Sequence, residues 1–99
     1  MTVFYLPRPD AADAGPRIGI TVSRALGGAV ERNRIKRRMR EAIRLHRAAL
    51  TSSMDLVFNP KKVVATVEFT ALEQEVSRSF EVIEKAAARM QAKERSNAP

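Results

Sequence analysis

A stripe of apolar residues inside a strongly basic segment limits the folds open to this chain more than any other feature. Between residues 29 and 50, the apolar positions recur at helical spacing and fall on one side of a helix: Ile35, Met39, Ala42, Ile43, His46 and Leu50. The opposite side carries a polar row in steps of four and three residues: Asn33, Arg37, Arg40, Arg44 and Arg47. Such a helix must bury one side against an apolar surface, so the chain is expected to fold in layers.

Three short strands are expected to supply that surface. Residues 17–23 alternate strictly, with Ile18, Ile20 and Val22 on one face, and residues 2–6 and 54–58 are β-branched or apolar runs. Residues 7–16 collect Pro, Asp, Ala and Gly and are expected to form a loop, and the stretch 59–68 is also assigned to a loop.

A second amphipathic helix is predicted near the end of the chain. Thr70-Ala71-Leu72-Glu73 matches a capping box that would start it. Its apolar stripe is Leu72, Val76, Phe80, Ile83, Ala87 and Met90. The predicted order is therefore strand, strand, helix, strand, helix. It corresponds to an α/β (α+β) two-layer sandwich, with helices on one face of a small sheet and the other face partly open. Residues 1–95 are expected to form a single domain, followed by a disordered tail at 96–99.

Composition excludes several classes of protein. The 99 residues include no Cys, which excludes disulfides and thiolate metal sites, and no apolar run long enough for a membrane helix. The first ten residues do not resemble a secretory leader, so a cytoplasmic location is expected. His46 is the only histidine and falls on the apolar stripe, so we interpret it as a packed residue, and no metal site is predicted.

The positive charge is concentrated in one helix. The net charge is +7, and eight of the cations lie between residues 32 and 47 beside a single acid, Glu41. The last helix, residues 68–95, is balanced with six acids and five cations. Seven of the eight cations are Arg, which suits bidentate contacts with phosphate and stacking on bases. This pattern favours a nucleic-acid partner.

The basic helix also has other interpretations. The alternatives are a solvated face, a membrane-surface helix and a DNA-reading helix. The apolar stripe consists mainly of Ile, Met, Ala and His and has no Trp or Phe, which disfavours a membrane-surface helix. Gly27-Gly28 forms either a phosphate-binding turn or a plain helix start. An enzyme acting on RNA by itself would need an acid/base pair, which the sequence does not offer. A structural or ribosome-associated RNA-binding protein remains an alternative.

The segment from Arg17 to Arg37 resembles the signature of the bacterial ribonuclease P protein. The matching residues are Arg17-Ile18-Gly19-Ile20-Thr21-Val22-Ser23, Gly27, and Ala29-Val30-Glu31-Arg32-Asn33-Arg34-Ile35-Lys36-Arg37, with the Arg-Asn-Arg motif at 32–34. Asp55-Leu56-Val57 followed by Pro60 adds to the likeness. In the family this block joins a strand to an Arg-rich helix.

The resemblance implies a fold similar to the second domain of a small ribosomal protein, with a left-handed βαβ crossover through the Arg-rich helix. It also implies a role as the accessory subunit of an endoribonuclease whose RNA subunit holds Mg²⁺ and removes the 5′ leader of precursor tRNA. The implied partners are ribonuclease P RNA and precursor tRNA; no protein partner and no protein-bound cofactor is expected. The implied RNA-binding residues are Arg24, Arg32, Asn33, Arg34, Lys36, Arg37, Arg40 and Arg44, and the implied leader-binding residues are Tyr5, Arg17, Lys61 and Lys62.

The chain departs from the family pattern in three places. Family members usually carry a helix before the first strand, whereas this sequence starts at the strand, which leaves Tyr5 and Phe4 as the aromatic candidates for stacking on leader bases. Two lysines common after the second strand are Arg24 and Ala25 here. Asn59 stands where an Arg often precedes the proline, and Lys61 and Lys62 are expected to compensate.

Overall fold

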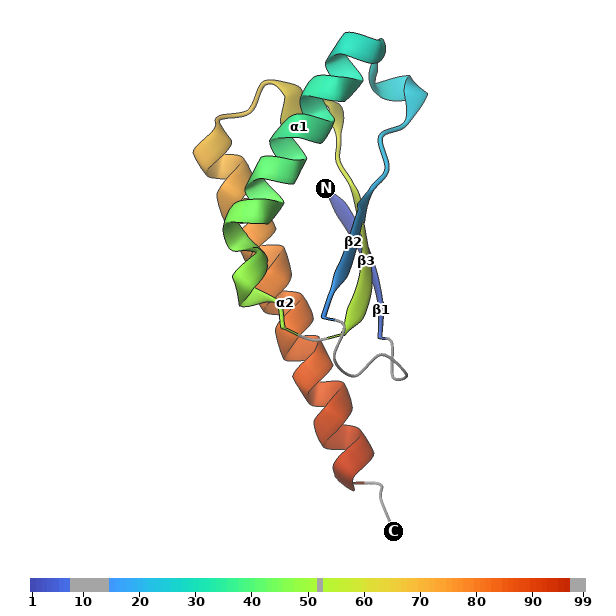
Figure 1. Cartoon of the computed structure of the whole chain (residues 1–99), viewed down its shortest axis with the longest axis vertical. Coiled ribbons are helices and arrows are strands. Elements are labelled where there is room, and N and C mark those ends of the chain that lie inside the picture. The colour runs from blue at the N-terminus through green and yellow to red at the C-terminus, as the bar shows by residue number, and fades with distance from the viewer. Residues whose placement is uncertain (8–14, 52, 97–99) are drawn as a thin grey trace.

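Two helices cover one face of a three-stranded sheet in the computed structural model of the chain, which describes residues 1–7, 15–51 and 53–96 (Figure 1). The strands are β1 (Thr2–Pro7), β2 (Arg17–Ile20) and β3 (Met54–Asn59), and the long helices are α1 (Ala29–His46) and α2 (Phe69–Ser96). Short 3₁₀ turns are η1 (Arg24–Leu26), η2 (Arg47–Ala49) and η3 (Lys62–Ala65). The predicted two-layer sandwich is confirmed. Of the expected tail at 96–99, Ser96 is the last residue of α2, and residues 97–99 lie outside the described residues.

The sheet has β3 at its centre, in the order β1-β3-β2. β1 runs antiparallel to β3, with Val3 opposite Phe58 and Tyr5 opposite Leu56. β2 runs parallel to β3, with Ile18 opposite Leu56 and Ile20 opposite Phe58. Because residues directly opposite one another share a face, this register decides which side chains of the edge strands turn towards the helices.

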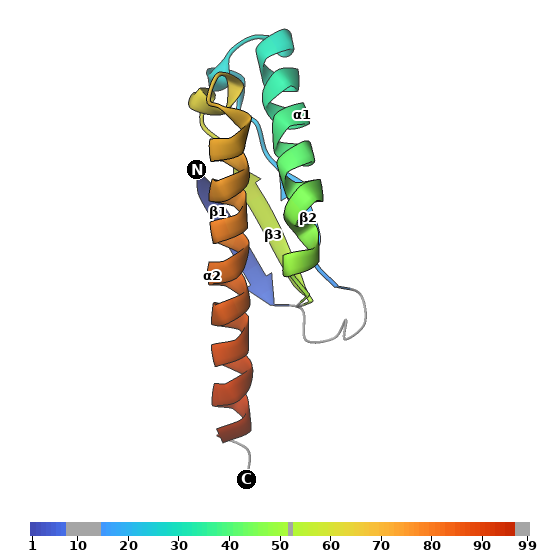
Figure 2. The same cartoon turned by 90° about the vertical axis from the view of Figure 1, so that its left-hand side faces the viewer.

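The connection from β2 through α1 to β3 is a left-handed crossover. In the view from the helical side (Figure 2), the chain rises along β2 at the right, descends through α1 in front of the sheet and rises again along β3 to the left. Nearly all parallel crossovers are right-handed, so this hand separates the fold from common α/β proteins. It agrees with the expectation drawn from the family resemblance.

The core fills the space between the helices and the inner face of the sheet. On β3, Met54, Leu56 and Phe58 are buried while the residues between them are not. The rings of Phe58 and Phe80 meet edge to face with 5.9 Å between centroids, which joins the central strand to α2. The predicted helical stripes are buried as expected at these positions: Ile35, Met39, Ala42, Ile43, Leu50, Leu72, Val76, Phe80, Ile83 and Ala87. The side chain of Met90 lies outside the described residues.

Several predicted boundaries were wrong. α1 ends at His46, and Leu50 reaches the core from the short η2 turn that follows. β2 ends at Ile20. The stretch assigned to a loop contains η3, which buries Val64 and Ala65. The capping box is absent because α2 begins at Phe69, one residue before Thr70, and the Glu73 carboxylate lies 3.4 Å from Nε2 of His46.

In the part of the chain that the structure describes, neither long helix is apolar over a stretch sufficient to cross a membrane. α2 continues well past the end of the sheet (Figure 1), which gives the molecule a long dimension of 54 Å against 24 and 20 Å.

Candidate nucleic-acid-binding site

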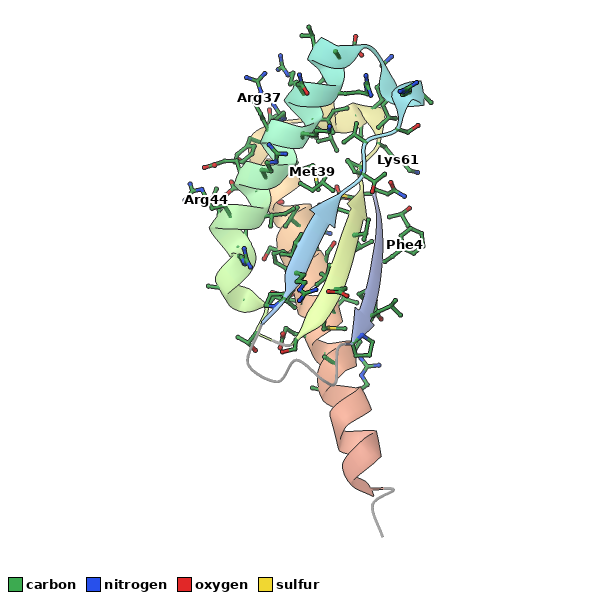
Figure 3. The ribbon with its side chains drawn as sticks, turned by 45° about the vertical axis from the view of Figure 1, so that its right-hand side comes forward. Phe4, Arg37, Met39, Arg44 and Lys61 are labelled. Carbon is green, nitrogen blue, oxygen red and sulfur yellow. The ribbon has the colours of Figure 1, made fainter. Side chains whose placement is uncertain are left out.

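The outer side of α1 presents a basic surface to solvent. Figure 3 shows Arg37 and Arg44 pointing away from the sheet and Met39 pointing towards it. Asn33, Arg34 and Arg40 are exposed like Arg37 and Arg44, whereas Ile35 and Met39 are fully buried. The sheet therefore takes up the apolar side of α1, and the guanidinium groups on the other side remain accessible to a polyanion. We call Asn33, Arg34, Arg37, Arg40 and Arg44 the basic face.

Arg44 is held by the one acid of this helix. Its Nε and Nη2 atoms donate to the two carboxylate oxygens of Glu41, at 3.1 and 2.5 Å. This hydrogen-bonded pair lowers the pKa of Glu41 and raises that of Arg44. Arg44 must therefore share its guanidinium between Glu41 and any phosphate, whereas within the described residues Arg37 and Arg40 make no ion pair.

Two cations of the same segment hold the fold together. Arg38 is half-buried; its guanidinium donates to the backbone carbonyl of Val67 and lies 5.9 Å from the centre of the Phe69 ring. Arg47 donates to the carbonyl of Pro16 at 3.2 Å, which ties the end of α1 to the start of β2. Both arginines contribute to the net charge of the chain. Their contacts within the protein give each of them a structural role that needs no RNA partner.

The remaining residues of the predicted RNA-binding set lie around the start of α1. Arg32 is half-buried, and its Nε is shielded from solvent with no hydrogen-bond partner in the described part of the chain. Arg24 is exposed at the start of η1. The turn between them depends on Gly27, whose φ of 133° belongs to a region that residues with a side chain rarely adopt.

A groove runs between α1 and the outer edge of β2. It holds about 400 Å³ and is lined by Ile18, Ile20, Lys36, Arg40, Ile43, Arg44 and Arg47. Four of these seven side chains are cations, and the other three are isoleucines. The side chain of Lys36 thus lines the groove and is not part of the basic face.

The uncovered face of the sheet lies on the opposite side of the molecule. Phe4, Leu6 and Val57 are exposed on it, at 59, 69 and 38% of their surface. In Figure 3, Phe4 points away from the helices. Tyr5 has the other parity in β1: it is half-buried and lines a groove against α2 with Val3. Of the two aromatic candidates for stacking on a leader base, Phe4 therefore lies on the open face, whereas Tyr5 lies on the side of α2.

The other predicted leader-binding residues lie at opposite ends of the sheet. Arg17 is exposed at the start of β2, opposite Asp55 in the register. Lys61 and Lys62 are exposed beyond the far end of β3, where η3 begins. They therefore flank the open face and do not form one cluster.

Sequence reasoning missed the groove and the two structural arginines. All the groove residues carry ordinary helical or strand periodicity, and only the placement of α1 over the edge of β2 brings them together. Arg38 and Arg47 gave no signal, because a partner carbonyl is not visible in a sequence.

Comparisons with known proteins agree with this geometry. The sequence model of the family Ribonuclease P matches residues 1–84. The ribonuclease P protein component of Finegoldia magna is 44% identical over 59 residues, which cover 60% of this chain and 52% of the relative. That of Chloroflexus aurantiacus is 45% identical over 62 residues, covering 62% and 46%. The chain thus spans about half the length of the curated relatives it matches.

Solved structures show the same fold. The RNase P protein from Thermotoga maritima superimposes with a TM-score of 0.68 at 27% identity, covering 79% of this chain and 72% of that one. An RNase P protein mutant from Staphylococcus aureus also gives 0.68, at 24% identity, over 83% and 67%. Together with the exposed basic helix and the left-handed crossover, the match over residues 1–84 shows that the chain belongs to the ribonuclease P protein family.

Proposed function

We propose that this chain is the protein subunit of ribonuclease P, which binds the catalytic RNA and assists Mg²⁺-dependent removal of the 5′ leader of precursor tRNA in the cytoplasm. The observation that carries the proposal is the family match over residues 1–84, on a structure that leaves the basic face accessible. The RNA subunit carries out catalysis, and the protein supplies phosphate contacts that stabilise the RNA.

The exposed arginines of the basic face support an accessory role beside the RNA. Guanidinium groups neutralise phosphate repulsion where RNA segments approach each other and Mg²⁺, so the protein lowers the Mg²⁺ concentration that the RNA needs.

We further propose that the 5′ leader crosses the open face of the sheet. Phe4 offers an exposed ring for stacking on an unpaired base, and Arg17, Lys61 and Lys62 flank that face. Phe4→Ala is expected to reduce stimulation for a substrate with a leader of several nucleotides and to leave a single-nucleotide leader unaffected. Equal loss on both substrates would exclude this path for the leader.

The decisive experiment is cleavage of a precursor tRNA by the cognate ribonuclease P RNA at limiting Mg²⁺, with and without the protein. Strong stimulation is expected, and the double variant Arg37→Ala/Arg40→Ala is expected to lose most of it. Lys85→Ala/Arg89→Ala removes the same charge from exposed positions of α2 and serves as the control. Intact RNA binding without stimulation would point to a general RNA-binding protein instead.

A further inference from the structure

We propose that the groove between α1 and β2 is a pocket for an unpaired RNA nucleotide. It adjoins the basic face that meets the phosphate backbone and shares Arg40 and Arg44 with it. The proposal rests on the proposed function only in taking RNA as the partner. The shape, the floor and the rim of the groove each favour a nucleotide as its ligand.

The shape of the groove excludes a duplex. Its volume of about 400 Å³ suits a single small ligand. An RNA duplex presents a regular backbone surface, which matches the exposed outer side of α1 better than a recess behind it. A nucleotide turned out of its stack can enter such a recess.

The floor of the groove is apolar. Ile18 and Ile20 project from β2, and Ile43 projects from α1 to meet them. Ile18 and Ile20 remain half-buried, whereas Ile43 is 7% exposed. A phosphate gains no stabilising contact from this apolar floor. The face of a base, in contrast, covers the exposed part of the floor and removes apolar surface from water.

The rim supplies charge for the phosphates on either side of that base. Arg44 and Arg47 are partly engaged, with Glu41 and with the carbonyl of Pro16. Lys36 and Arg40 lie one helical turn apart and make no ion pair within the described residues. Both cations are therefore available to phosphate at the groove mouth.

The edge of β2 offers backbone groups to the same space. β2 pairs with β3 on one side, and the amide of Thr21 donates to the carbonyl of Phe58 at 2.9 Å. Because successive amides of an extended strand point to opposite edges, the amide of Ile20 points away from β3, towards the outer edge. Backbone donors and acceptors at that edge suit the hydrogen-bonding edge of a base.

The isoleucines of this chain provide the test. The chain has five: Ile18, Ile20 and Ile43 line the groove, whereas Ile35 and Ile83 are buried elsewhere in the core. With selectively labelled isoleucine methyl groups, NMR spectra of the full chain are recorded during titration with a single-stranded trinucleotide of uridylate and, separately, with a blunt-ended RNA duplex. The trinucleotide is expected to shift the three groove methyl signals saturably and to leave Ile35 and Ile83 in place. Groove signals that do not move, or that move equally with the duplex, would overturn the proposal.

A matched pair of variants measures the rim. Lys36→Ala is expected to weaken binding of the trinucleotide about tenfold, which corresponds to one charge-assisted contact. Lys85→Ala makes the same chemical change at an exposed site of α2 and is expected to leave the affinity unchanged. The unshifted core methyl signals of Ile35 and Ile83 verify that each variant is folded. Equal affinity of the two variants would show that Lys36 does not contact the nucleotide, and it would overturn the assignment of Lys36 to the rim.

Cleavage assays separate this proposal from the subunit role. Stimulated cleavage with unmoved groove signals would overturn the nucleotide pocket alone. Saturable groove shifts without any stimulation would support the pocket and overturn the subunit role.

Discussion

Individual arginines of α1 differ in what they do, although the sequence presents them as one cluster. Arg37 and Arg40 point to solvent, Arg44 pairs with Glu41, and Arg38 reaches the carbonyl of Val67. A cation that satisfies a buried acceptor contributes to folding, and an unpaired cation on the surface adds to repulsion between like charges. Adjacent positions are therefore expected to separate stability from RNA affinity.

The pair Arg37 and Arg38 tests that separation. Arg38→Ala is expected to lower the free energy of unfolding by about 1–2 kcal/mol, since it leaves the Val67 carbonyl without its donor and removes the contact with Phe69. Arg37→Ala is expected to change stability little. Urea denaturation followed by circular dichroism measures both, and equal midpoints would contradict the structural role of Arg38.

Glu41 is expected to limit RNA affinity. Glu41→Gln removes the negative charge that engages Arg44 and raises the net charge of the helix by one, so binding of ribonuclease P RNA should tighten. Fluorescence anisotropy at several salt concentrations measures the change. Weaker binding by the variant would show that the pair with Glu41 positions Arg44 for RNA.

The same pair defines a pH dependence. Arg44 holds the pKa of Glu41 in the folded chain below its ordinary value of 4.5. A carboxyl group with a lowered pKa stabilises the fold above its unfolded pKa, and this contribution is lost as pH falls through the folded value. The contribution of Glu41 is therefore complete at neutral pH and disappears only in acid.

At the scale of elements, the junction between β2 and α1 decides where the basic face starts. Gly27 has a φ of 133°, and a Cβ atom placed there would lie 2.2 Å from Oε2 of Glu31. Gly28, the next residue, has a φ of −74° and open space around it. The two glycines thus look alike in sequence but meet different steric demands.

Gly27→Ala is expected to destabilise the fold by about 1–3 kcal/mol, the cost of a side-chain-bearing residue in this backbone region. Gly28→Ala is the matched control and is expected to be nearly neutral, because its backbone is extended and unobstructed. Thermal unfolding of the two variants compares them directly. Similar losses in both would mean that the junction adapts its conformation.

At the scale of the whole molecule, the sandwich places two candidate RNA surfaces on opposite sides. The basic face lies on the outside of α1, and the open face with Phe4 lies beyond the sheet (Figure 3). One RNA helix cannot cover both surfaces, so we expect separate RNA segments, or two different RNAs, to contact the protein.

Salt dependence measures the basic face as a unit. If the four arginines of the basic face meet phosphates, the logarithm of the binding constant should fall with the logarithm of salt concentration at a slope of about −2.8 to −3.6. Arg37→Ala should flatten that slope by about one unit. Arg89→Ala, at an exposed site of α2, should not change it. An unchanged slope in Arg37→Ala would exclude Arg37 from the phosphate contacts.

Periodicity in the sequence by itself determined the two amphipathic helices, the strand that begins at Arg17 and the opposition of charged and apolar sides on α1. These features depend on spacing along one element, so local geometry is enough to predict them. The capping box predicted at Thr70 does not form: α2 begins at Phe69, and the Glu73 carboxylate lies beside His46 of α1, a contact between distant segments.

Only the tertiary structure decided which residues of different elements share a surface. In β1 both parities are apolar, so alternation alone did not reveal that Phe4 faces out and Tyr5 faces in; pairing with β3 decided it. The left-handed crossover places α1 over the edge of β2, and this placement forms the groove between the two elements. Contacts between distant segments depend on the packing of the whole chain, and no local pattern encodes them.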